Sequence, residues 1–312
     1  MRTWASRRTG FLAVGGGHTL RWWQSGNPRG KALLILHGGP GGRSSARQRT
    51  LADPGQWRII QVDQRGCGSS TPRGHCAANT LDDLVEDLER LRRHLGIDRW
   101  TVLGPSWGAV LALASAARRP HTVRALLLTG LFLGTARECE VFRTGRGVDP
   151  SAWRGFTAWL DPAEREDVPG AYARRIHNPA HPDHETALRH WCAFDLVRSS
   201  LEFDPLRVPV GPGVAESLRV ETHYVRNNFF LPSGGVLAML PRTLLTPVTV
   251  VQGVQDRFGA ENALLLRESA LNTSVTWIDG GHSALEPALR IGLSIALEEI
   301  NADRHPKEGK WM

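Results

Sequence analysis

Short apolar segments and helix-period segments alternate along the first part of the chain. The segments 31–36 (KALLIL) and 58–63 (RIIQVD) are apolar runs bounded by polar residues, Gly and Pro, which is typical of buried parallel strands. Further strands are predicted over 100–104 and 123–129, with a helix rich in Ala and Leu over 107–118. This alternation predicts a doubly wound α/β sheet whose strands are mostly parallel.

Another helix is expected directly after Thr80. Apolar residues recur on one helical face from Leu81 to Leu95, and Gly96 ends the pattern. Thr80 and Asp83 resemble a capping box in which Asp takes the place of the usual Glu. We therefore predict that this helix begins after Thr80 and ends before Gly96.

The alternation breaks between residues 134 and 241. That stretch has no comparable apolar strand, and it carries helix-period segments over 162–176 and 184–201, separated by Pro-rich joints. We therefore predict an α/β core, residues 1–133 and 242–312, interrupted by a helical cap domain, residues 134–241. In the second part of the core we expect strands over 247–252 and 274–279 and helices over 261–271 and 284–300.

Composition places the chain among ordinary globular proteins. Of its 312 residues 41% are hydrophobic and 22% are charged, a balance that excludes disorder, coiled coil and collagen. No apolar run approaches the roughly 20 residues of a membrane span, and no secretory leader pattern is visible, so we expect a cytoplasmic protein without a membrane partner. The cysteines are far apart and lack metal-ligand spacing, so we expect them to be reduced and expect no metal: Cys67, Cys76, Cys139 and Cys192.

The positive charge of the chain raises the question of a nucleic-acid partner. The formal net charge is +7 and the isoelectric point is about 9.9. Only three of the 38 basic residues are lysines (Lys31, Lys307 and Lys310), and the arginines are scattered among acids. Nucleic-acid binding calls for a localised basic stripe, so we expect no nucleic-acid partner.

The pentapeptide Gly104-Pro105-Ser106-Trp107-Gly108 matches G-x-S-x-G. In that motif a sharp turn between a strand and a helix lifts a serine hydroxyl above the sheet. The pattern alone is weak evidence in a chain with 33 glycines. A predicted strand precedes it and a predicted helix follows it, which is the context that the motif requires. Ser106 is therefore the candidate nucleophile.

A serine hydroxyl becomes a strong nucleophile when a histidine takes its proton, and that histidine needs a carboxylate to hold it. Where G-x-S-x-G is used, the acid and then the histidine follow the serine along the chain, after later strands. His282 and Asp256 both come just after predicted strands. Asp63 and Asp279 also follow strands, but Asp63 precedes Ser106 and Asp279 is too near His282 to face it. We therefore expect His282 as the base and Asp256 as the acid.

A glycine-rich loop, residues 37–42 (HGGPGG), follows the first predicted core strand. Glycines there let backbone N–H groups turn toward a developing oxyanion. A phosphate-binding loop is the alternative, but the segment lacks both G-x-x-x-x-G-K-[ST] and G-x-G-x-x-G, and Pro40 removes one donor. We expect the N–H groups of Gly39 and Trp107 to form an oxyanion hole.

Six motifs, in the right order, resemble those of the proline iminopeptidases in the α/β-hydrolase superfamily. The similarity extends from about Phe11 to Ile300. It implies an α/β-hydrolase fold and removal of an N-terminal proline from small peptides by a Ser-Asp-His triad, without any cofactor, and it assigns that triad to Ser106, Asp256 and His282. The six motifs are HGGPGG (37–42), DQRGCGSS (63–70), GPSWG (104–108), GLFL (130–133), HYVRNNFF (223–230) and GGHSALEP (280–287).

The resemblance also implies residues that recognise the substrate. Glu221 and Asp195 resemble the cap carboxylates that grip the free amine, and Phe132 matches an aromatic residue of the proline pocket. From the residues alone, the two acids would fit a solvated helix face equally well. The chain departs from the family at Thr129, where Arg is common, at Asp195, where Glu is usual, and at Arg43, which replaces the last Gly of the oxyanion loop. The chemistry looks retained and the recognition altered.

Three functions therefore stand side by side, while the oligomeric state is not indicated. The first is an aminopeptidase that releases an N-terminal proline or a similar small amino acid through an acyl-enzyme. The second is a specialised amidase or esterase for another acyl substrate, such as a small metabolite or a peptide natural product. The third is an inactive hydrolase fold that only binds a ligand. Epoxide hydrolase and dehalogenase chemistry is disfavoured because it uses a carboxylate nucleophile.

Overall fold

The computed structural model describes residues 8–198, 204–241, 244–270, 272–303 and 309–310. Within them, nine strands form a single sheet in the order β1-β2-β4-β3-β5-β6-β7-β8-β9. Its strands are β1 (Arg8–Gly15), β2 (His18–Gly26), β3 (Lys31–Ile35), β4 (Trp57–Val62), β5 (Trp100–Pro105), β6 (Val123–Thr129), β7 (Val248–Gly253), β8 (Thr273–Ile278) and β9 (Gly309–Lys310).

The sheet is mostly parallel, as predicted. The pairs from β4 to β9 are parallel, whereas β1 pairs with β2 and β2 with β4 in antiparallel fashion. The six predicted core strands all form, with ends within one or two residues of expectation. The hairpin of β1 and β2 was not among the predicted elements. Its signals are the alternating burial along β2 and the three glycines at the turn, Gly15 to Gly17, all with positive φ.

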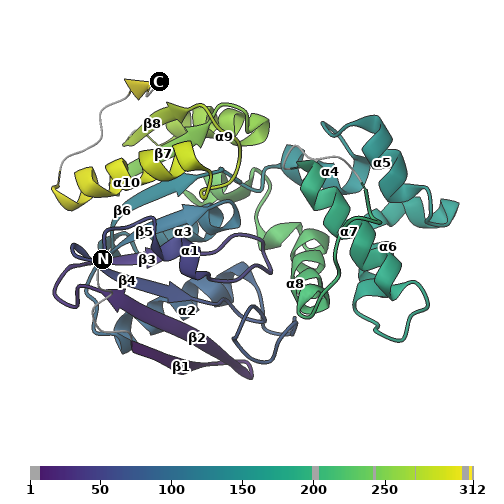
Figure 1. Ribbon diagram of the computed structural model, residues 1–312, viewed down its shortest axis with the longest axis horizontal. Coiled ribbons are helices and arrows are strands. Elements are labelled where there is room, and N and C mark those ends of the chain that lie inside the picture. Colours follow the sequence, from purple (N-terminus) through teal and green to yellow (C-terminus); the bar gives the residue numbers. More distant parts are fainter. Residues whose placement is uncertain (1–7, 199–203, 242–243, 271, 304–308, 311–312) are drawn as a thin grey trace.

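Helices cover both faces of the sheet, which explains the continuous apolar runs of the strands. Adjacent residues of one strand point to opposite faces, so Leu34 joins the apolar cluster of α2 and α3 while Leu33 joins that of α10. These core helices are α1 (Ala46–Arg49), α2 (Leu81–His94), α3 (Trp107–Arg118), α9 (Arg257–Ser269) and α10 (Pro287–Asn301). Figure 1 shows them packed along the sheet.

The capping box predicted at the start of α2 is present. The Thr80 hydroxyl accepts the N–H of Asp83, and the Asp83 carboxylate accepts the N–H of Thr80. Two other predicted helix starts were wrong. Helix α9 begins at Arg257 rather than 261 because the Asp256 carboxylate caps it, and α10 begins at Pro287 rather than 284. The predicted last residue of α9, Leu271, lies outside the described residues.

Between β6 and β7 the described chain contains α-helices and 3₁₀ turns and no strand. The predicted helix over 162–176 is two elements, the 3₁₀ turn η2 (Pro162–Asp167) and α6 (Val168–Ile176). Pro169 lacks an N–H group and fits only the first turn of a helix, so α6 has to begin beside it. Residues 199–201 of the other predicted helix lie outside the described residues. The remaining helices are α4 (Ala136–Thr144), α5 (Pro150–Thr157), α7 (His184–Arg198) and α8 (Val214–Arg226).

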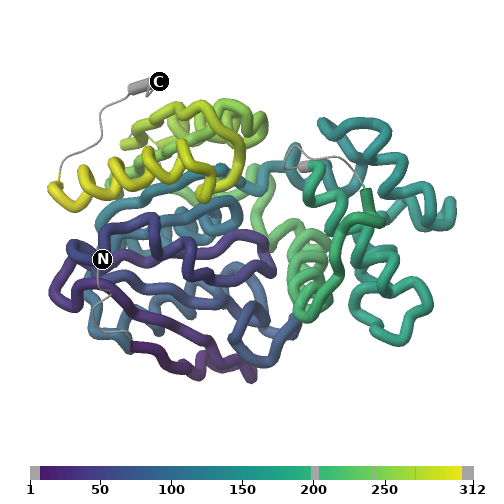
Figure 2. Tube along the Cα trace, viewed as in Figure 1, coloured from purple at the N-terminus to yellow at the C-terminus, as the bar shows by residue number. Residues whose placement is uncertain are grey.

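Figures 1 and 2 show these helices gathered beside the sheet, with α8 nearest to the core. An aromatic cluster holds them together, in which Phe156 stacks on Tyr172 and on Phe194 at centroid distances of 4.3 and 4.1 Å. We propose that residues 134–241 form a cap domain on the core made by the segments on either side. In the described residues no helix has both the length and the apolar character that crossing a membrane requires.

Candidate active site

Ser106 occupies a strained turn between β5 and α3. Its φ of 53° and ψ of −123° lie where few non-glycine residues are found, and its N–H donates to the Thr129 carbonyl at 3.1 Å. Strand and helix cross so closely here that a Cβ at position 104 would clash with the Gly108 backbone. The glycines of the pentapeptide therefore permit the turn that presents the serine.

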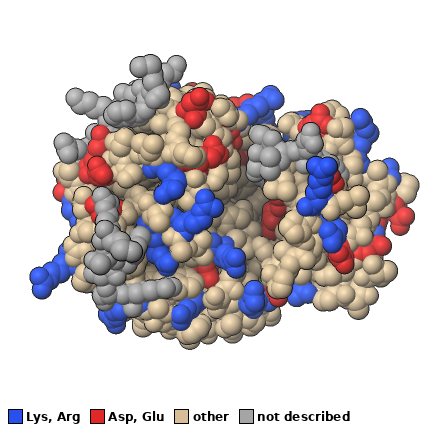
Figure 3. All heavy atoms as spheres, viewed as in Figure 1, with Lys and Arg blue, Asp and Glu red and all other residues tan. Residues whose placement is uncertain are grey.

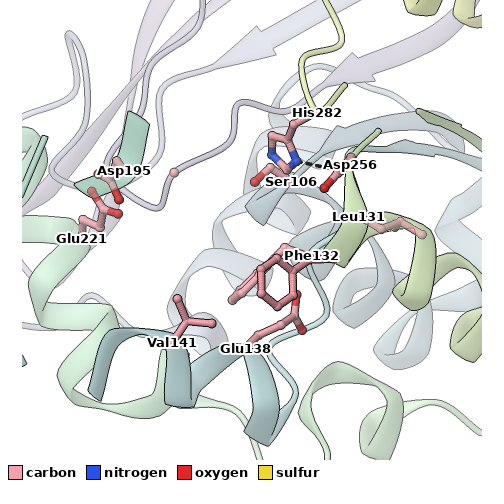
Figure 4. A pocket seen from close by; sticks show the side chains of 11 residues that line it. Ser106, Leu131, Phe132, Glu138, Val141, Asp195, Glu221, Asp256 and His282 are labelled. Carbon is pink, nitrogen blue, oxygen red and sulfur yellow. Dashed lines mark hydrogen bonds and ion pairs between the residues drawn. The ribbon is translucent and has the colours of Figure 1, made fainter. Parts of the chain in front are cut away.

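His282 and Asp256 meet beside this turn, from the loops after β8 and β7. His282 Nδ1 donates to Asp256 Oδ2 at 2.8 Å, and Figure 4 shows Ser106 next to the imidazole ring. The two rejected acids serve elsewhere. Asp63 accepts backbone N–H groups of its own loop region, and the exposed Asp279 accepts the Gln255 amide. The structure thus brings together the three residues that the sequence selected.

Asp256 is held by groups besides His282. Its Oδ2 also accepts Gln252 Nε2 at 3.0 Å, and its Oδ1 accepts the Gly259 N–H at 3.1 Å as the cap of α9. Burial by itself raises the pKa of Asp256, but the hydrogen bond and charge of His282, with the Gly259 and Gln252 hydrogen bonds, outweigh it and keep the pKa below its ordinary value. Asp256 is therefore a carboxylate at neutral pH. Sequence reasoning missed Gln252, which is fully buried.

The loop that carries His282 is fixed by Glu286. Its two carboxylate oxygens accept the N–H groups of Gly281 and Ser283, at 2.7 and 3.1 Å, on either side of the histidine. On the other side of the loop, a Cβ at Gly130 would clash with the His282 carbonyl. The GGHSALEP motif thus contains the histidine together with the acid that orders its loop.

The glycine-rich loop lies directly against the serine. Gly39 lines the same cavity as Ser106, and its φ of 120° requires glycine. A Cβ at Gly38 would lie 3.3 Å from the Ser106 Cβ. Within the described part of the chain, neither the Gly39 nor the Trp107 N–H donates a hydrogen bond to another protein group. Both donors are therefore free to meet an oxyanion.

Gln64 of the DQRGCGSS motif connects this loop to the serine turn. Its backbone N–H donates to His37 Nε2 at 3.0 Å, and its side-chain amide donates to the His37 carbonyl at 3.0 Å. Its side-chain oxygen accepts Trp107 Nε1 at 2.9 Å. One buried glutamine therefore fixes the relative position of the two segments expected to supply the oxyanion hole.

Ser106 opens into a cavity of about 240 Å³ between the sheet and the cap helices. Its apolar wall includes Phe132, the residue implied to line a proline pocket, and three residues that sequence reasoning missed because no motif marks them: Leu131, Val141 and Phe258. Phe132 is held by an edge-to-face contact with Phe229 at 4.8 Å between ring centroids. The space beside the serine suits a small acyl group.

Asp195 of α7 and Glu221 of α8 lie together at the far end of this cavity. Figure 4 shows both carboxylates across from Ser106 and His282. Glu221 is 9% exposed. The neighbouring Cys192 thiol registers the negative charge: burial first, and then Asp195 and Glu221, raise its pKa to about 12. The expectation of a solvated helix face therefore fails for Glu221.

A further carboxylate, Glu138, lies in the wall of the cavity and was missed. It accepts the Thr135 N–H at 2.9 Å and Asn262 Nδ2 at 2.7 Å, and burial raises its pKa. The sequence carried a signal for it, because Thr135 and Glu138 form a capping box at the start of α4. Thr129, where an arginine was implied, is fully buried, and its hydroxyl has no hydrogen-bond partner among the described residues.

Comparison with known proteins agrees with this geometry. Residues 31–288 match the α/β hydrolase fold family, so the chain belongs to the α/β hydrolases. It is 36% identical over 292 residues to the proline iminopeptidase of Xanthomonas citri, covering 89% of this chain and 91% of that protein. It is 35% identical over 309 residues to the proline iminopeptidase of Arabidopsis thaliana, covering 94% and 80%.

The chain therefore belongs to the proline iminopeptidase family, and it is a hydrolase. A solved proline iminopeptidase structure from Mycobacterium smegmatis has the same fold, with a TM-score of 0.59 and 21% identity over 95% of this chain and 99% of that one.

Proposed function

We propose that this protein releases an N-terminal proline, or a similar small amino acid, from a short peptide or amide through an acyl-enzyme. One observation carries the proposal: a single cavity has Ser106 with the His282–Asp256 pair at one end and the carboxylates of Asp195 and Glu221 at the other. Such a cavity offers a nucleophile for a carbonyl group and negative charge for an ammonium group.

In the proposed reaction the Ser106 hydroxyl attacks the substrate carbonyl while His282 Nε2 accepts its proton. The Gly39 and Trp107 N–H groups stabilise the oxyanion, and loss of one such donor typically costs about 3 to 4 kcal/mol. His282 then gives the proton to the leaving amine. A water molecule, deprotonated by His282, attacks the resulting ester, releases the amino acid and restores Ser106. Asp256 orients the imidazole and stabilises its charged form.

Substrate selection in this proposal depends on both ends of the cavity. A free ammonium group that enters a closed site loses its hydration, so it needs the negative charge of Asp195 and Glu221 in exchange. The proline ring lies against Phe132 and the apolar residues beside it. An N-blocked substrate has no charge to offer and is expected to bind poorly.

An amidase or esterase for another acyl donor is the second candidate, and two observations favour it. Asp195 is one methylene shorter than the usual Glu, and Thr129 provides no arginine to support it. Recognition of a free amine is weaker if the Asp195 carboxylate lies farther from the ammonium.

Hydrolysis of four chromogenic substrates separates the candidates: the 4-nitroanilides of proline, alanine and N-acetylproline, and 4-nitrophenyl acetate. We expect cleavage of the proline anilide, little cleavage of the N-acetyl compound, and loss of several orders of magnitude in the Ser106→Ala variant. Cleavage of the ester alone would favour the second candidate. Failure to cleave any of them, or full activity of Ser106→Ala, would contradict the proposal.

A further inference from the structure

A second cavity of about 550 Å³ adjoins the first. Asp195 and Glu221 line both cavities, so the carboxylate pair stands at the boundary between them. Figure 3 shows the surface hollowed between the core and the cap helices, with basic side chains gathered on the core side of the hollow. The first cavity has room for one small acyl group, so the remainder of a peptide has to lie elsewhere.

The oxyanion loop leads from one cavity to the other. Gly39 lines the first cavity, whereas Gly41 and Gly42 line the second. None of the three has a side chain to obstruct a ligand on this path. The Gly41 carbonyl accepts the Ser217 hydroxyl at 2.7 Å, and a Cβ at Gly41 would clash with the Ser217 backbone. This contact fixes the loop against α8, so the two cavities keep their relative position.

The second cavity combines an apolar wall with two cationic side chains. Arg43 and Arg73 line it from the core side, and both are exposed. Within the described residues, neither guanidinium is in an ion pair or a hydrogen bond with another protein group. Glu216 is the further acid of the lining, in the first turn of α8. The apolar residues of the wall are Leu196, Val208, Pro209, Pro212, Val214 and Leu218.

These features have a direction. The acids that both cavities share form one end of the second cavity, and the two arginines belong to the loops on the core side, Arg43 directly after the oxyanion loop. An apolar group with a carboxylate satisfies both the wall and the guanidinium groups, whereas a second ammonium group would meet repulsion from the arginines. The departure at Arg43 thus supplies a charge where the family has a glycine.

We propose that the second cavity is a subsite for an apolar group that bears a carboxylate, namely the carboxyl-terminal residue that follows the scissile bond of a short peptide. This inference rests on the proposed function, because it takes the first cavity to hold the aminoacyl part. The preferred substrates are then dipeptides of a small N-terminal residue and an apolar residue with a free carboxylate, rather than long chains.

Calorimetric titration with N-acetylleucine and with N-acetylleucine amide tests the cavity by itself, because neither ligand has a free amine. We expect the acid to bind about fivefold more tightly than the amide, the size of effect that two partly solvated charge contacts give. An Arg43→Gln/Arg73→Gln double variant is expected to lose this preference. Arg47→Gln is the matched control, since Arg47 is exposed, close in sequence to Arg43 and outside the cavity.

Equal binding of acid and amide, or a preference that survives in the double variant, would overturn the subsite. Hydrolysis of prolyl-leucine and of prolyl-leucine amide then tests what the subsite holds. We expect a kcat/KM about fivefold higher for the free acid, through KM, and no such difference in the double variant. Equal kcat/KM values would overturn the assignment to the leaving residue. If neither peptide is cleaved while the calorimetric preference stands, the proposed function fails and the carboxylate subsite remains.

Discussion

Gln252 Nε2 donates to Oδ2 of Asp256 at 3.0 Å, the same oxygen that accepts His282 Nδ1 at 2.8 Å. The other end of the Gln252 amide accepts the N–H of Leu131 at 3.1 Å, and Leu131 lines the substrate cavity. One buried side chain therefore links the acid of the proposed triad to the wall that faces the substrate. Its role is to position both.

Gln252→Leu is expected to lower kcat/KM by roughly tenfold, because a lost buried hydrogen bond costs about 1 to 3 kcal/mol. Kinetics on proline 4-nitroanilide measures this, and a thermal melt checks the fold. Gln255→Leu is the matched control, since Gln255 contacts the exposed Asp279 instead of Asp256. Equal losses in both variants would show that Gln252 has no special role in positioning.

Glu286→Ala is expected to lower kcat several-fold with a smaller effect on KM. The substitution removes both acceptors that hold the Gly281 and Ser283 N–H groups, so His282 loses its fixed orientation. Glu286→Gln keeps an acceptor oxygen and should recover part of the rate. If the alanine variant keeps the full kcat, the loop is ordered by other contacts.

The pH dependence of kcat/KM should show a fall on the acid side. Hydrogen bonds hold the pKa of Asp256 below its ordinary value of about 4, so Asp256 stays ionised until the pH drops through that lowered pKa. A loss of activity between pH 8 and pH 5 therefore reports protonation of His282, which has to be neutral to accept the serine proton. A flat profile over this range, with the protein shown to be folded, would exclude a histidine base.

The same argument predicts a distinct profile for the Gln252 variant. Gln252 is one of the groups that lower the pKa of Asp256, so its loss raises that pKa. The carboxylate is then protonated at a higher pH, and the variant should lose additional activity below about pH 5 relative to the wild type. A purely structural defect would lower the whole profile without changing its shape.

Glu221→Gln is expected to cost more than Asp195→Asn on free-amine substrates. Glu221 keeps the usual side-chain length and is buried, and loss of a charge-assisted hydrogen bond in a closed site costs roughly 1.5 to 3 kcal/mol in kcat/KM. Hydrolysis of 4-nitrophenyl acetate serves as the control, because this ester brings no ammonium group. Equal losses on the amide and on the ester would mean that Glu221 supports the cap rather than the amine.

The residues that the sequence identified share one property: each follows a strand. Ser106, Asp256 and His282 come after β5, β7 and β8, and the carboxyl ends of parallel strands meet at one edge of a sheet. Chain order along such a sheet was therefore enough to select them. The apolar runs of the core strands were equally informative because both faces of the sheet are buried.

The residues that the sequence did not identify act through contacts between distant segments. Gln252 is a polar residue inside an apolar strand, and only its contacts to Leu131 and Asp256 show its role. The second cavity involves Arg43, Arg73 and the region before α8, which come together only in the folded chain. A local pattern cannot contain such information, since it depends on how the cap helices pack on the core.

Mass spectrometry after reaction with a diphenyl phosphonate analogue of proline tests the central claim most directly. Attack by the Ser106 hydroxyl on phosphorus expels phenol and leaves a covalent adduct. We predict a single adduct on Ser106, formed much faster with the free-amine probe than with its N-acetyl form, and absent from Ser106→Ala. An adduct on another residue, no adduct at all, or equal rates for the two probes would contradict the account of a serine nucleophile that faces an amine-binding carboxylate pair.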